Sequence, residues 1–354
     1  MKKLLCLIVA LTMLLTATTG LAQSISVDTN RARENLTWEF TGDQYKLVCY
    51  WPAPDVFFDS YVKQGLEAFN ADFGQDVYWT IGTAWTQDIE NQACEALAAQ
   101  GYDLFYIFGA DTSGANALYK ELYDNGCKVI NYGGLVNDPQ ESALTLCSNV
   151  YVQAYNSTLR LIDLMGGEGT IINVLENLGD VNTQKRQEGV EAAVSEYPNV
   201  SIAQTLADIN VAAEGHEKVS NALAGNAGVK GIIATGGSAS QGLATAMEDY
   251  YAVNPNADHI FCATMDQSDE VMKGIAEGYV DHTVSQNGWA MGYVSPLILM
   301  YLADGWEPQN WGEHIDTGYI FITVENMNTW QADIETAAMN MIASIEADVL
   351  KQPA

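Results

Sequence analysis

Short apolar runs alternate with longer stretches of helical spacing along this chain. Residues 57–73, 86–100 and 113–125 carry apolar side chains at i, i+3 and i+4 spacing, which predicts helices with one buried face. The runs between them are continuously apolar, as in strands that are covered on both faces. The first series of predicted strands is at residues 45–51, 76–81, 104–108, 128–132 and 143–147.

The same alternation starts again in the second half of the chain. Helices are predicted at 181–196 and 240–251, and the chain closes with a helix over 288–303, an extended run at 319–324 and a helix over 326–350. Two strand–helix series predict an α/β protein with two doubly wound parallel sheets. The second series of predicted strands is at residues 169–175, 201–206, 231–234, 259–264 and 280–285.

The two series define two expected lobes joined by a hinge. We expect the N-terminal lobe to comprise residues 45–149 with 287–315, and the C-terminal lobe 150–286 with 316–354, after a polar N-terminal extension over 23–44. Ligands of open α/β sheets bind beyond the carboxyl ends of the strands. The candidate functional residues are therefore those that directly follow each strand.

The first 22 residues have the pattern of a secretory signal peptide. Lys2 and Lys3 precede an apolar run over 4–15, and small residues over 16–22 end in a plausible cleavage site before Gln23. The alternative is an uncleaved membrane anchor, but the apolar run is shorter than the roughly 20 residues that span a bilayer. The pattern favours a cleaved, periplasmic or secreted product.

The composition of the chain limits the classes of partner that it can bind. The 354 residues include 15 Lys plus Arg against 45 Asp plus Glu, a formal charge of −30, and 48% of them are hydrophobic. Such a chain buries a core, and its negative field disfavours nucleic acid and anionic membrane surfaces. Small neutral or cationic ligands remain, and we expect a monomer.

The sequence offers little for catalysis. His216-Glu217 lacks the second histidine of H-E-x-x-H, and neither a G-x-S-x-G elbow nor a phosphate-binding loop is present, so we predict no enzyme, cofactor or metal site. A glycosidase that uses Asp55 and Asp266 stays an alternative. A transcription regulator would need a helix-turn-helix in place of the export signal. Five cysteines outside the signal peptide are expected to be buried thiols: Cys49, Cys94, Cys127, Cys147 and Cys262.

Candidate contacts in the first half are aromatic. Trp51 ends the first predicted strand, Asp55 and Phe57 follow it, and Trp85 follows the second. Aromatic faces cover the C–H side of a sugar ring while carboxylates take its hydroxyls, so this mixture is typical of a sugar site. The alternative for Phe57 is a core position in the helix that it opens.

Candidate contacts in the second half are polar. Arg186 lies in the helix after the strand at 169–175, Asp266 follows the strand at 259–264, and Gln286 ends the strand at 280–285. Basic residues are scarce in this chain, so an arginine near a strand end is a candidate for binding. The alternatives are a surface ion pair for Arg186 and capping or loop roles for Asp266 and Gln286.

Four short motifs resemble the ribose-binding-protein-like group of periplasmic sugar-binding proteins. Asp55-Val56-Phe57-Phe58 is similar to the family's loop after the first strand, and Arg186 before Glu188-Gly189 is similar to its arginine motif. Met265-Asp266 and Ser285-Gln286 are similar to its strand-end aspartate and glutamine. The resemblance covers about residues 45–324.

The resemblance implies a type I periplasmic binding protein fold and a role in uptake. Such a protein captures a monosaccharide or a similar small neutral solute and delivers it to an ABC permease. The alternative partner is a sensor kinase or chemoreceptor, since both respond to ligand-driven closure.

Two positions depart from the family pattern. Ribose-type members carry an Asp-Arg pair where this chain has Gly133-Gly134 after Tyr132, and an Asn-Asp pair where it has Gly236-Gly237. The glycines are expected to open space for a bulkier or less hydroxylated ligand, with an aromatic residue such as Tyr132 replacing the lost polar contacts.

Overall fold

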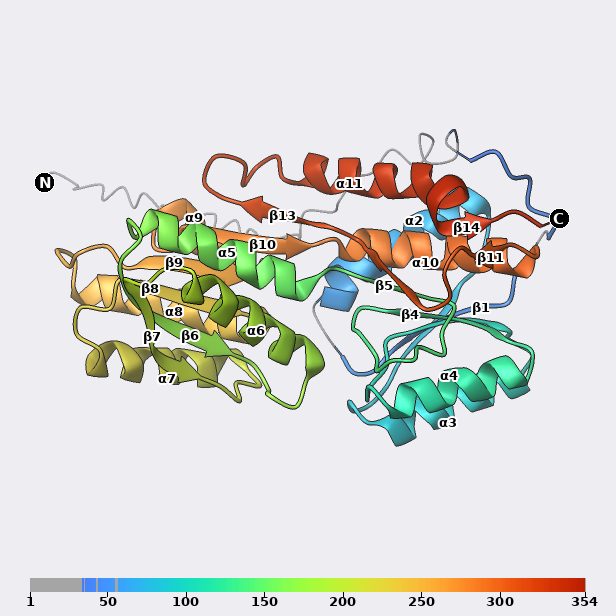
Figure 1. The fold of residues 1–354 in the computed structure, drawn as a ribbon, viewed down its shortest axis with the longest axis horizontal. Helices are drawn as coiled ribbons and strands as arrows, with labels where there is room; N and C mark the ends of the chain where they lie inside the picture. Colours follow the sequence, from blue (N-terminus) through green and yellow to red (C-terminus); the bar gives the residue numbers. More distant parts are fainter. Residues whose placement is uncertain (1–33, 35, 43, 55–56, 354) are drawn as a thin grey trace, which may run out of the picture.

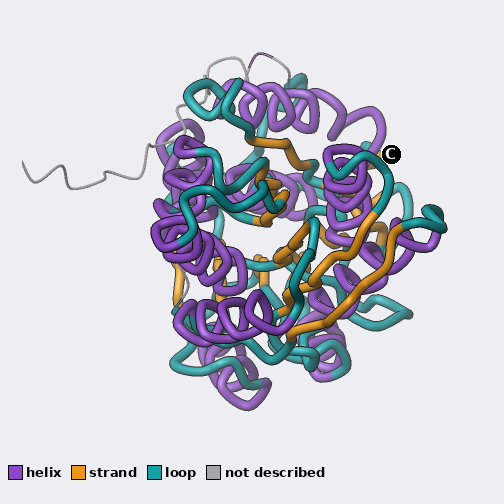
Figure 2. Tube along the Cα trace, turned by 90° about the vertical axis from the view of Figure 1, so that its left-hand side faces the viewer, coloured by secondary structure: helices purple, strands orange, loops and turns teal. Residues whose placement is uncertain are grey.

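The computed structural model describes residues 34, 36–42, 44–54 and 57–353 (Figure 1). The predicted signal peptide and Asp55 lie outside these residues. The described chain forms two lobes, each built on a central sheet, and helices enclose the strands in the end-on view (Figure 2). The predicted α/β class with two doubly wound sheets is confirmed.

The sheet of the N-terminal lobe has six parallel strands in the order β12-β5-β4-β3-β1-β2. Its core strands are uniformly apolar, because helices cover both faces. The predicted runs correspond to five of the six strands, and β12 is additional. The strands are β1 (Leu47–Trp51), β2 (Tyr78–Ile81), β3 (Leu104–Ile107), β4 (Lys128–Tyr132), β5 (Leu144–Cys147) and β12 (Glu313–Asp316).

The sheet of the C-terminal lobe repeats this order as β13-β10-β9-β8-β6-β7. Only β13 is antiparallel, and it pairs with β10 from Thr283↔Ile322 to Gln286↔Tyr319. The strands are β6 (Gly169–Leu175), β7 (Val200–Leu206), β8 (Gly231–Thr235), β9 (Phe261–Met265), β10 (His282–Gln286) and β13 (Tyr319–Ile322).

Helices pack on both faces of each sheet. In the N-terminal lobe, Val48 and Tyr50 of β1 face α3 and α4, while Leu47 and Cys49 face α2 and α10, as the two-residue period of a strand requires. The N-terminal lobe contains η1 (a π-helical turn, Phe58–Val62), α2 (Lys63–Phe73), α3 (Gln87–Ala99), α4 (Gly114–Asp124) and α10 (Gly288–Ala303). The C-terminal lobe contains α5 (Val150–Leu164), α6 (Val181–Ser195), α7 (Ala212–Gly225), α8 (Gly237–Val253) and α9 (Asp269–Glu277).

Helix α10 is apolar on all sides and is buried from Gly288 to Leu302. It crosses η1 and α2 at a glycine contact: a Cβ at Gly292 would lie 1.9 Å from the Val62 carbonyl oxygen, and one at Gly65 would lie 2.0 Å from that of Trp289. The close approach requires glycine at both positions. It fixes η1 against the helix that leaves the second lobe.

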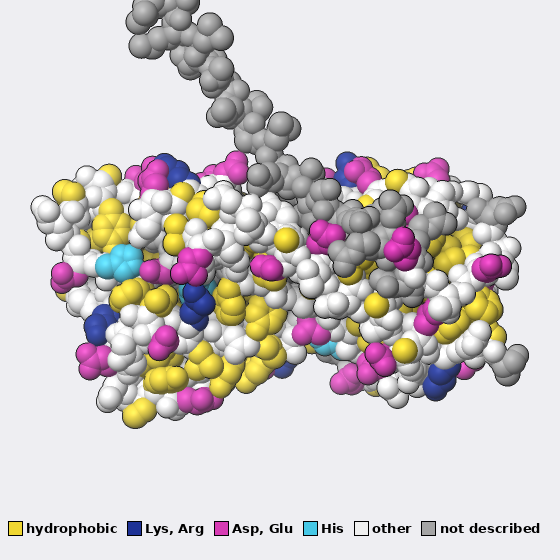
Figure 3. Space-filling view, turned by 90° about the horizontal axis from the view of Figure 1, so that it is seen from above, with side chains coloured by type: hydrophobic (Ala, Val, Ile, Leu, Met, Phe, Trp, Pro, Cys, Tyr) yellow, Lys and Arg dark blue, Asp and Glu magenta, His cyan; other side chains and the backbone are white. Residues whose placement is uncertain are grey.

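Three segments connect the lobes, at β5–α5, β10–α10 and β12–β13. Hydrogen bonds tie them together: the Ser148 hydroxyl lies 2.9 Å from that of Thr317 and donates to the Gly318 carbonyl, and the Asn287 N–H donates to the same carbonyl. The crossing is therefore a compact, polar bundle, and the space-filling view shows the lobes as two bodies that are indented between them (Figure 3).

The C-terminal end differs from the prediction of one helix over 326–350. The helix α11 (Gln331–Ser344) is followed by a π-helical turn, η2 (Ile345–Val349), and by β14 (Leu350–Lys351), which pairs with β11 (Glu307–Pro308). Glu346 in η2 accepts hydrogen bonds from the Tyr301 hydroxyl of α10 and from the Trp38 N–H. The chain end thus binds to the base of α10 together with the N-terminal segment.

Candidate functional site

The strand order places a topological switch point in each lobe. In the first sheet β1 lies between β2 and β3, and in the second β6 lies between β7 and β8, so the chain reverses its winding direction next to β1 and β6. Ligands of doubly wound sheets bind at the carboxyl ends of the strands at this switch point. These are the ends of β1 and β3 in one lobe and of β6 and β8 in the other.

The two sets of strand ends face one another. The Tyr61 hydroxyl of η1 donates to the Gln267 carbonyl after β9 at 3.3 Å, and the Asn182 amide of α6 approaches the Gly133 carbonyl after β4 at 3.5 Å. Both contacts join residues of different lobes. The candidate site therefore lies between the lobes, with one wall from each.

The wall from the N-terminal lobe is aromatic. Trp51 ends β1 with 2% of its surface exposed, and its ring centroid lies 4.7 Å from that of Phe108 at 79°, and 6.2 Å from that of Phe57 at 28°. Trp85 packs edge-on against Phe108 at 5.0 Å, and its indole N–H donates to the Ala110 carbonyl. Because 43% of Trp85 is exposed, it forms the rim of this wall.

Tyr132 lies beneath these rings. Its side chain is fully buried, and its hydroxyl donates to the Tyr50 carbonyl and lies 3.3 Å from Cys49 Sγ. Its ring centroid is 5.8 Å from that of Trp51 and 6.2 Å from that of Phe108. Tyr132 therefore supports the two rings from the core side.

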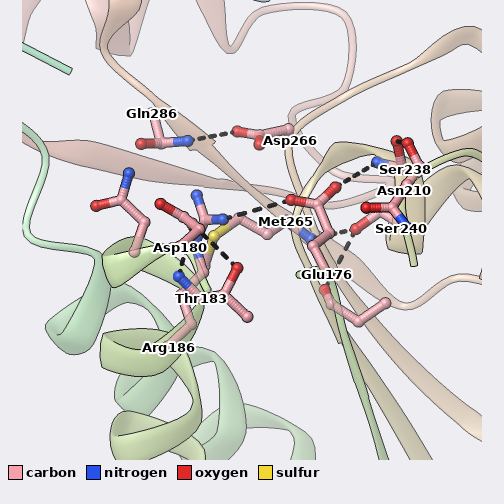
Figure 4. Close-up of polar contacts among 12 residues, drawn as sticks. Glu176, Asp180, Thr183, Arg186, Asn210, Ser238, Ser240, Met265, Asp266 and Gln286 are labelled. Atoms are coloured by element: carbon pink, nitrogen blue, oxygen red, sulfur yellow. Dashed lines mark hydrogen bonds and ion pairs between the residues drawn. The ribbon is translucent and has the colours of Figure 1, made fainter. Parts of the chain in front are cut away.

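The wall from the C-terminal lobe is ionic. Arg186 of α6 is 6% exposed, and its Nη1 lies 3.8 Å from Oε2 of Glu176 at the end of β6 (Figure 4). The Gln286 amide donates to Asp266 Oδ1 at 2.9 Å, so the ends of β9 and β10 are joined. Asp180 caps α6 by accepting the Thr183 N–H, and this fixes the helix that carries Arg186.

Burial and the nearby positive charge shift the pKa values of the carboxyl groups in this cluster in opposite directions. Desolvation raises the pKa of the Asp266 carboxyl, and the nearby Arg186 guanidinium and the Gln286 amide offset part of that rise. Desolvation also raises the pKa of Glu176, where Arg186 and the Ser238 N–H act in the opposite direction. Arg186 is therefore shared by two carboxylates, and its Nε has no hydrogen-bond partner among the described residues.

The backbone at Asp266 is left-handed, with φ of 63°, which is uncommon for a residue other than glycine. Two bonds to β10 hold it: the Asp266 N–H donates to the Val284 carbonyl, and the Thr283 hydroxyl donates to the Asp266 carbonyl. Strained backbone of this kind persists where the surroundings fix it, often at functional sites. It directs the carboxylate toward Gln286 and Arg186.

The expected open space is wrong at three of the four glycines, Gly133, Gly134 and Gly236, whereas a Cβ at Gly237 would meet nothing within 4 Å. A Cβ at Gly133 or Gly134 would lie 2.7 Å from the Phe108 ring, and one at Gly236 would lie 2.3 Å from the Glu176 carboxylate. Phe108 and Glu176 therefore fill the volume that the glycines leave. Sequence reasoning missed both residues as site candidates, although each directly follows a strand at a switch point.

The structure thus gathers the predicted residues on two walls. Arg186, Asp266 and Gln286 form one cluster, whereas Trp51, Phe57 and Trp85 belong to the opposite aromatic group, with Tyr132 behind it. Asp111, between β3 and α4, accepts the N–H groups of Ser113 and Gly114 at the start of α4 and so caps that helix. The five described cysteines are free and buried.

The fold and this site between two lobes define the class of two-lobed solute-binding proteins. Residues 47–307 match the family model described as periplasmic binding protein domain, so the chain belongs to the periplasmic binding protein family. The resemblance seen in the sequence is confirmed. Among the described helices, none combines the length and the hydropathy that crossing a bilayer requires.

Several known proteins are similar to this chain. An ABC transporter solute-binding protein from Burkholderia graminis, solved with D-arabinose, is 19% identical with a TM-score of 0.72, over 83% of this chain and 99% of that one. An ABC transporter solute-binding protein from Bacillus halodurans, solved with myo-inositol bound, is 18% identical with a TM-score of 0.71. The match covers 82% of this chain and 99% of that one. A chain of the XylFII-LytSN complex is 16% identical with a TM-score of 0.68. The match covers 80% of this chain and 98% of that one.

A curated relative is the xylose/arabinose-binding protein XylF of Sulfolobus acidocaldarius. It is 22% identical over 172 residues, which are 48% of this chain. The match spans 42% of that relative's length.

Proposed function

We propose that this protein captures a monosaccharide or a similar small neutral solute between its lobes, outside the cytoplasm, and delivers it unaltered to an ABC transporter. The observation that carries the proposal is the pairing of an aromatic wall with a wall of charged and amide groups across one interlobe site. The family, and the sugars present in similar structures, support it.

The two walls match the two chemical faces of a sugar. The rings of Trp51 and Phe108 offer flat apolar surface to the C–H face, while Arg186, Asp266 and Gln286 offer donors and acceptors to the hydroxyls. Buried donors without partners in the described residues, Trp51 Nε1 and Arg186 Nε, gain hydrogen bonds from such a ligand. Each bond to a charged group contributes about 1.5 to 3 kcal/mol.

Binding between two lobes couples capture to a change of shape. A ligand that contacts both walls stabilises the closed arrangement, and a hinge at the three connecting segments allows the lobes to separate. We propose that the lobes move as residues 45–149 with 287–315 and 150–286 with 316–354. The transporter then distinguishes the loaded protein by the surface that closure brings together.

A binding role is favoured over a glycosidase. Glycosidases place two carboxyl groups on either side of the scissile bond. Of the pair Asp55 and Asp266, Asp55 lies outside the described residues, and the described carboxylates Glu176 and Asp266 lie in the same lobe and share Arg186. We therefore propose that the protein is not an enzyme, and expect no hydrolysis of a panel of aryl glycosides.

The test is a thermal-shift screen of purified mature protein against pentoses, hexoses, deoxy sugars, polyols and nucleosides. A ligand that binds only the folded state raises the melting temperature in proportion to ln(1 + [L]/Kd). We expect one group of related neutral sugars to raise it. No shift with any member of the panel would contradict the proposal.

A second candidate is ligand presentation to a sensor. One similar chain was solved in the XylFII-LytSN complex, so this fold also occurs bound to a second protein. Growth of a deletion strain on the identified sugar separates the two roles. Loss of uptake favours transport, and loss of induction with uptake intact favours sensing.

Export is part of the proposal. We propose that the signal peptide is cleaved before Gln23 and that the mature protein is a periplasmic monomer. N-terminal sequencing of the exported protein tests the cleavage position.

A further inference from the structure

The Glu176 side chain is partly buried and lies against the start of α8. Its Oε1 accepts the Ser238 N–H at 2.8 Å, in the first turn of that helix. Gly236, with φ of 134°, leaves the space that the carboxylate fills, since a Cβ there would lie 2.3 Å from Glu176 Cδ and Oε2. The carboxylate therefore has a fixed place at the switch point of the second sheet.

The first turn of a helix attracts anions, because its N–H groups are unpaired and the helix dipole is positive there. In α8 the Glu176 carboxylate already occupies this position. An anionic ligand group at the same strand ends would find the attractive N–H taken and a fixed negative charge in its place.

The charges around the site add to this effect. Glu176 and Asp266 place two carboxyl groups beside the single positive charge of Arg186, which opposes the rise in pKa that burial causes in both. No other lysine or arginine of the described residues forms an ion pair with either carboxylate. Asp180, at the start of α6, adds a further negative group nearby (Figure 4). The wall is thus net negative although it contains the arginine.

We propose that Glu176 is a specificity-determining residue that excludes acidic sugars from the site. This inference rests on the proposed function and refines it: the ligand class is neutral polyhydroxy compounds, and uronic acids are rejected. The Glu176 side chain is also 25% exposed, so its carboxylate is available to accept a hydrogen bond from a ligand hydroxyl. A neutral sugar gains that contact, whereas a carboxylate at the same place is repelled.

The test compares a neutral sugar with its acid. Calorimetry at pH 7 measures the affinities of wild type and Glu176→Gln for glucose against glucuronate and for galactose against galacturonate, which differ by a single oxidised carbon. Xylose and arabinose are tested beside them as the counterparts that lack this carbon. Wild type is expected to prefer the neutral sugar at least tenfold, and Glu176→Gln to reduce that ratio at least threefold.

The ratio of the affinities for the neutral sugar and the acid distinguishes a role of Glu176 in specificity from a merely structural role. Glutamine keeps the shape and the acceptor for the Ser238 N–H, so a merely structural role would weaken both ligands equally and leave the ratio unchanged. Glu176→Ala is the second variant if glutamine folds poorly, with the same expected direction. Glu188→Gln is the control, because it removes one charge from an exposed residue of α6 that pairs with Lys185, and it is expected to keep the wild-type ratio.

Three outcomes would overturn the inference. Wild type that binds the acid as tightly as the neutral sugar contradicts it, and so does an unchanged ratio in both Glu176 variants while the neutral sugar still binds. In these two cases the proposed function stands. If no neutral sugar binds wild type, the proposed function fails and this inference fails with it.

Discussion

The two lobes have the same strand order but present opposite chemistry to the site between them. The N-terminal lobe ends its switch-point strands with Trp51 and Phe108, whereas the C-terminal lobe has Glu176 beside the paired glycines and Arg186 above it. The topology determines where a ligand contact lies, and the side chains at these few positions determine what it recognises.

The difference also affects how each wall is held. Aromatic rings are held largely by packing, and Trp51 contacts four other rings. Buried charges need partners, because an unpaired ion in an apolar environment is strongly destabilising. We therefore expect the ionic wall to respond to single substitutions more strongly than the aromatic wall.

The largest effect on binding is expected for Arg186→Ala. The change removes charge-assisted hydrogen bonds to the ligand and leaves Glu176 and Asp266 without their shared counter-charge, so affinity should fall by roughly 2 to 4 kcal/mol. Calorimetry with the sugar found in the screen measures it. Lys185→Ala, next to it on the exposed side of α6, is the control and should bind as wild type. Wild-type affinity in Arg186→Ala would remove this residue from the site.

The lobes should also differ in their response to pH. Burial lowers the pKa of His282 in the C-terminal lobe to about 3, from 6.5 when unfolded, so the unfolded state binds more protons below pH 6.5. The stability that His282 contributes is present above pH 6.5 and decreases as the pH falls, by about 2 kcal/mol at pH 5. Burial raises the pKa of Glu90 in the N-terminal lobe to about 7, from 4.5, so its contribution is present below pH 4.5 and lost as the pH rises toward 7.

Urea unfolding between pH 5 and pH 7 checks these opposite signs. Relative to wild type, His282→Gln should gain stability on going from pH 7 to pH 5, and Glu90→Gln should lose it. Slopes of the same sign in the two variants would contradict the assignment of these groups.

A smaller loss of affinity is expected for Asp266→Asn. Asparagine adopts the left-handed backbone that this position requires, so the change removes the charge with little strain. The acceptor for the Gln286 amide remains, and the expected loss is about 1 to 2 kcal/mol. The melting temperature of the unliganded variant checks that folding is intact. Unchanged affinity would place Asp266 outside the site.

Phe108→Leu tests the aromatic wall. Leucine fills much of the volume against Gly133 and Gly134 but lacks the flat ring, so affinity should fall by about 1 kcal/mol. Tyr119→Phe, in the core of the same lobe, is the control, because it keeps the ring and removes only a buried hydroxyl. A loss as large as that of Arg186→Ala would contradict the ranking of the two walls.

The smallest effect is expected for Trp85→Ala. Trp85 is exposed at the rim and contacts the Phe108 ring edge-on. It therefore orients Phe108 and does not itself fill a pocket. The expected loss is below about 1 kcal/mol. A loss above that of Phe108→Leu would show that the rim closes directly over the ligand.

The fold was readable from the sequence because buried parallel strands are short apolar runs between helical stretches. The strand β12 was missed, since Glu313–Asp316 is a polar, short edge strand without that signature. The C-terminal helix was predicted too long, because α11 and the π-helical turn η2 share one apolar face. Backbone hydrogen bonding, which differs between them, is not visible in a hydrophobic pattern.

The candidate site was readable only in part. Arg186, Asp266 and Gln286 follow strands, and the structure brings them together; their contact with a ligand stays a prediction. Phe108 ends the predicted strand 104–108 and Glu176 directly follows the predicted strand 169–175, but a sequence does not show that these strands flank the switch point. The glycine pairs indicated missing side chains, but not that Phe108 and Glu176 fill the space beside Gly133, Gly134 and Gly236.

The most direct test is a crystal structure of the protein with the neutral sugar that gives the largest thermal shift. We predict that the sugar lies between the lobes, in contact with Phe108 on one side and with Arg186 and Asp266 on the other, and is chemically unchanged. A sugar bound elsewhere would contradict it, for example in the 360 Å³ pocket beside Trp306 and Trp311 at the far end of the N-terminal lobe.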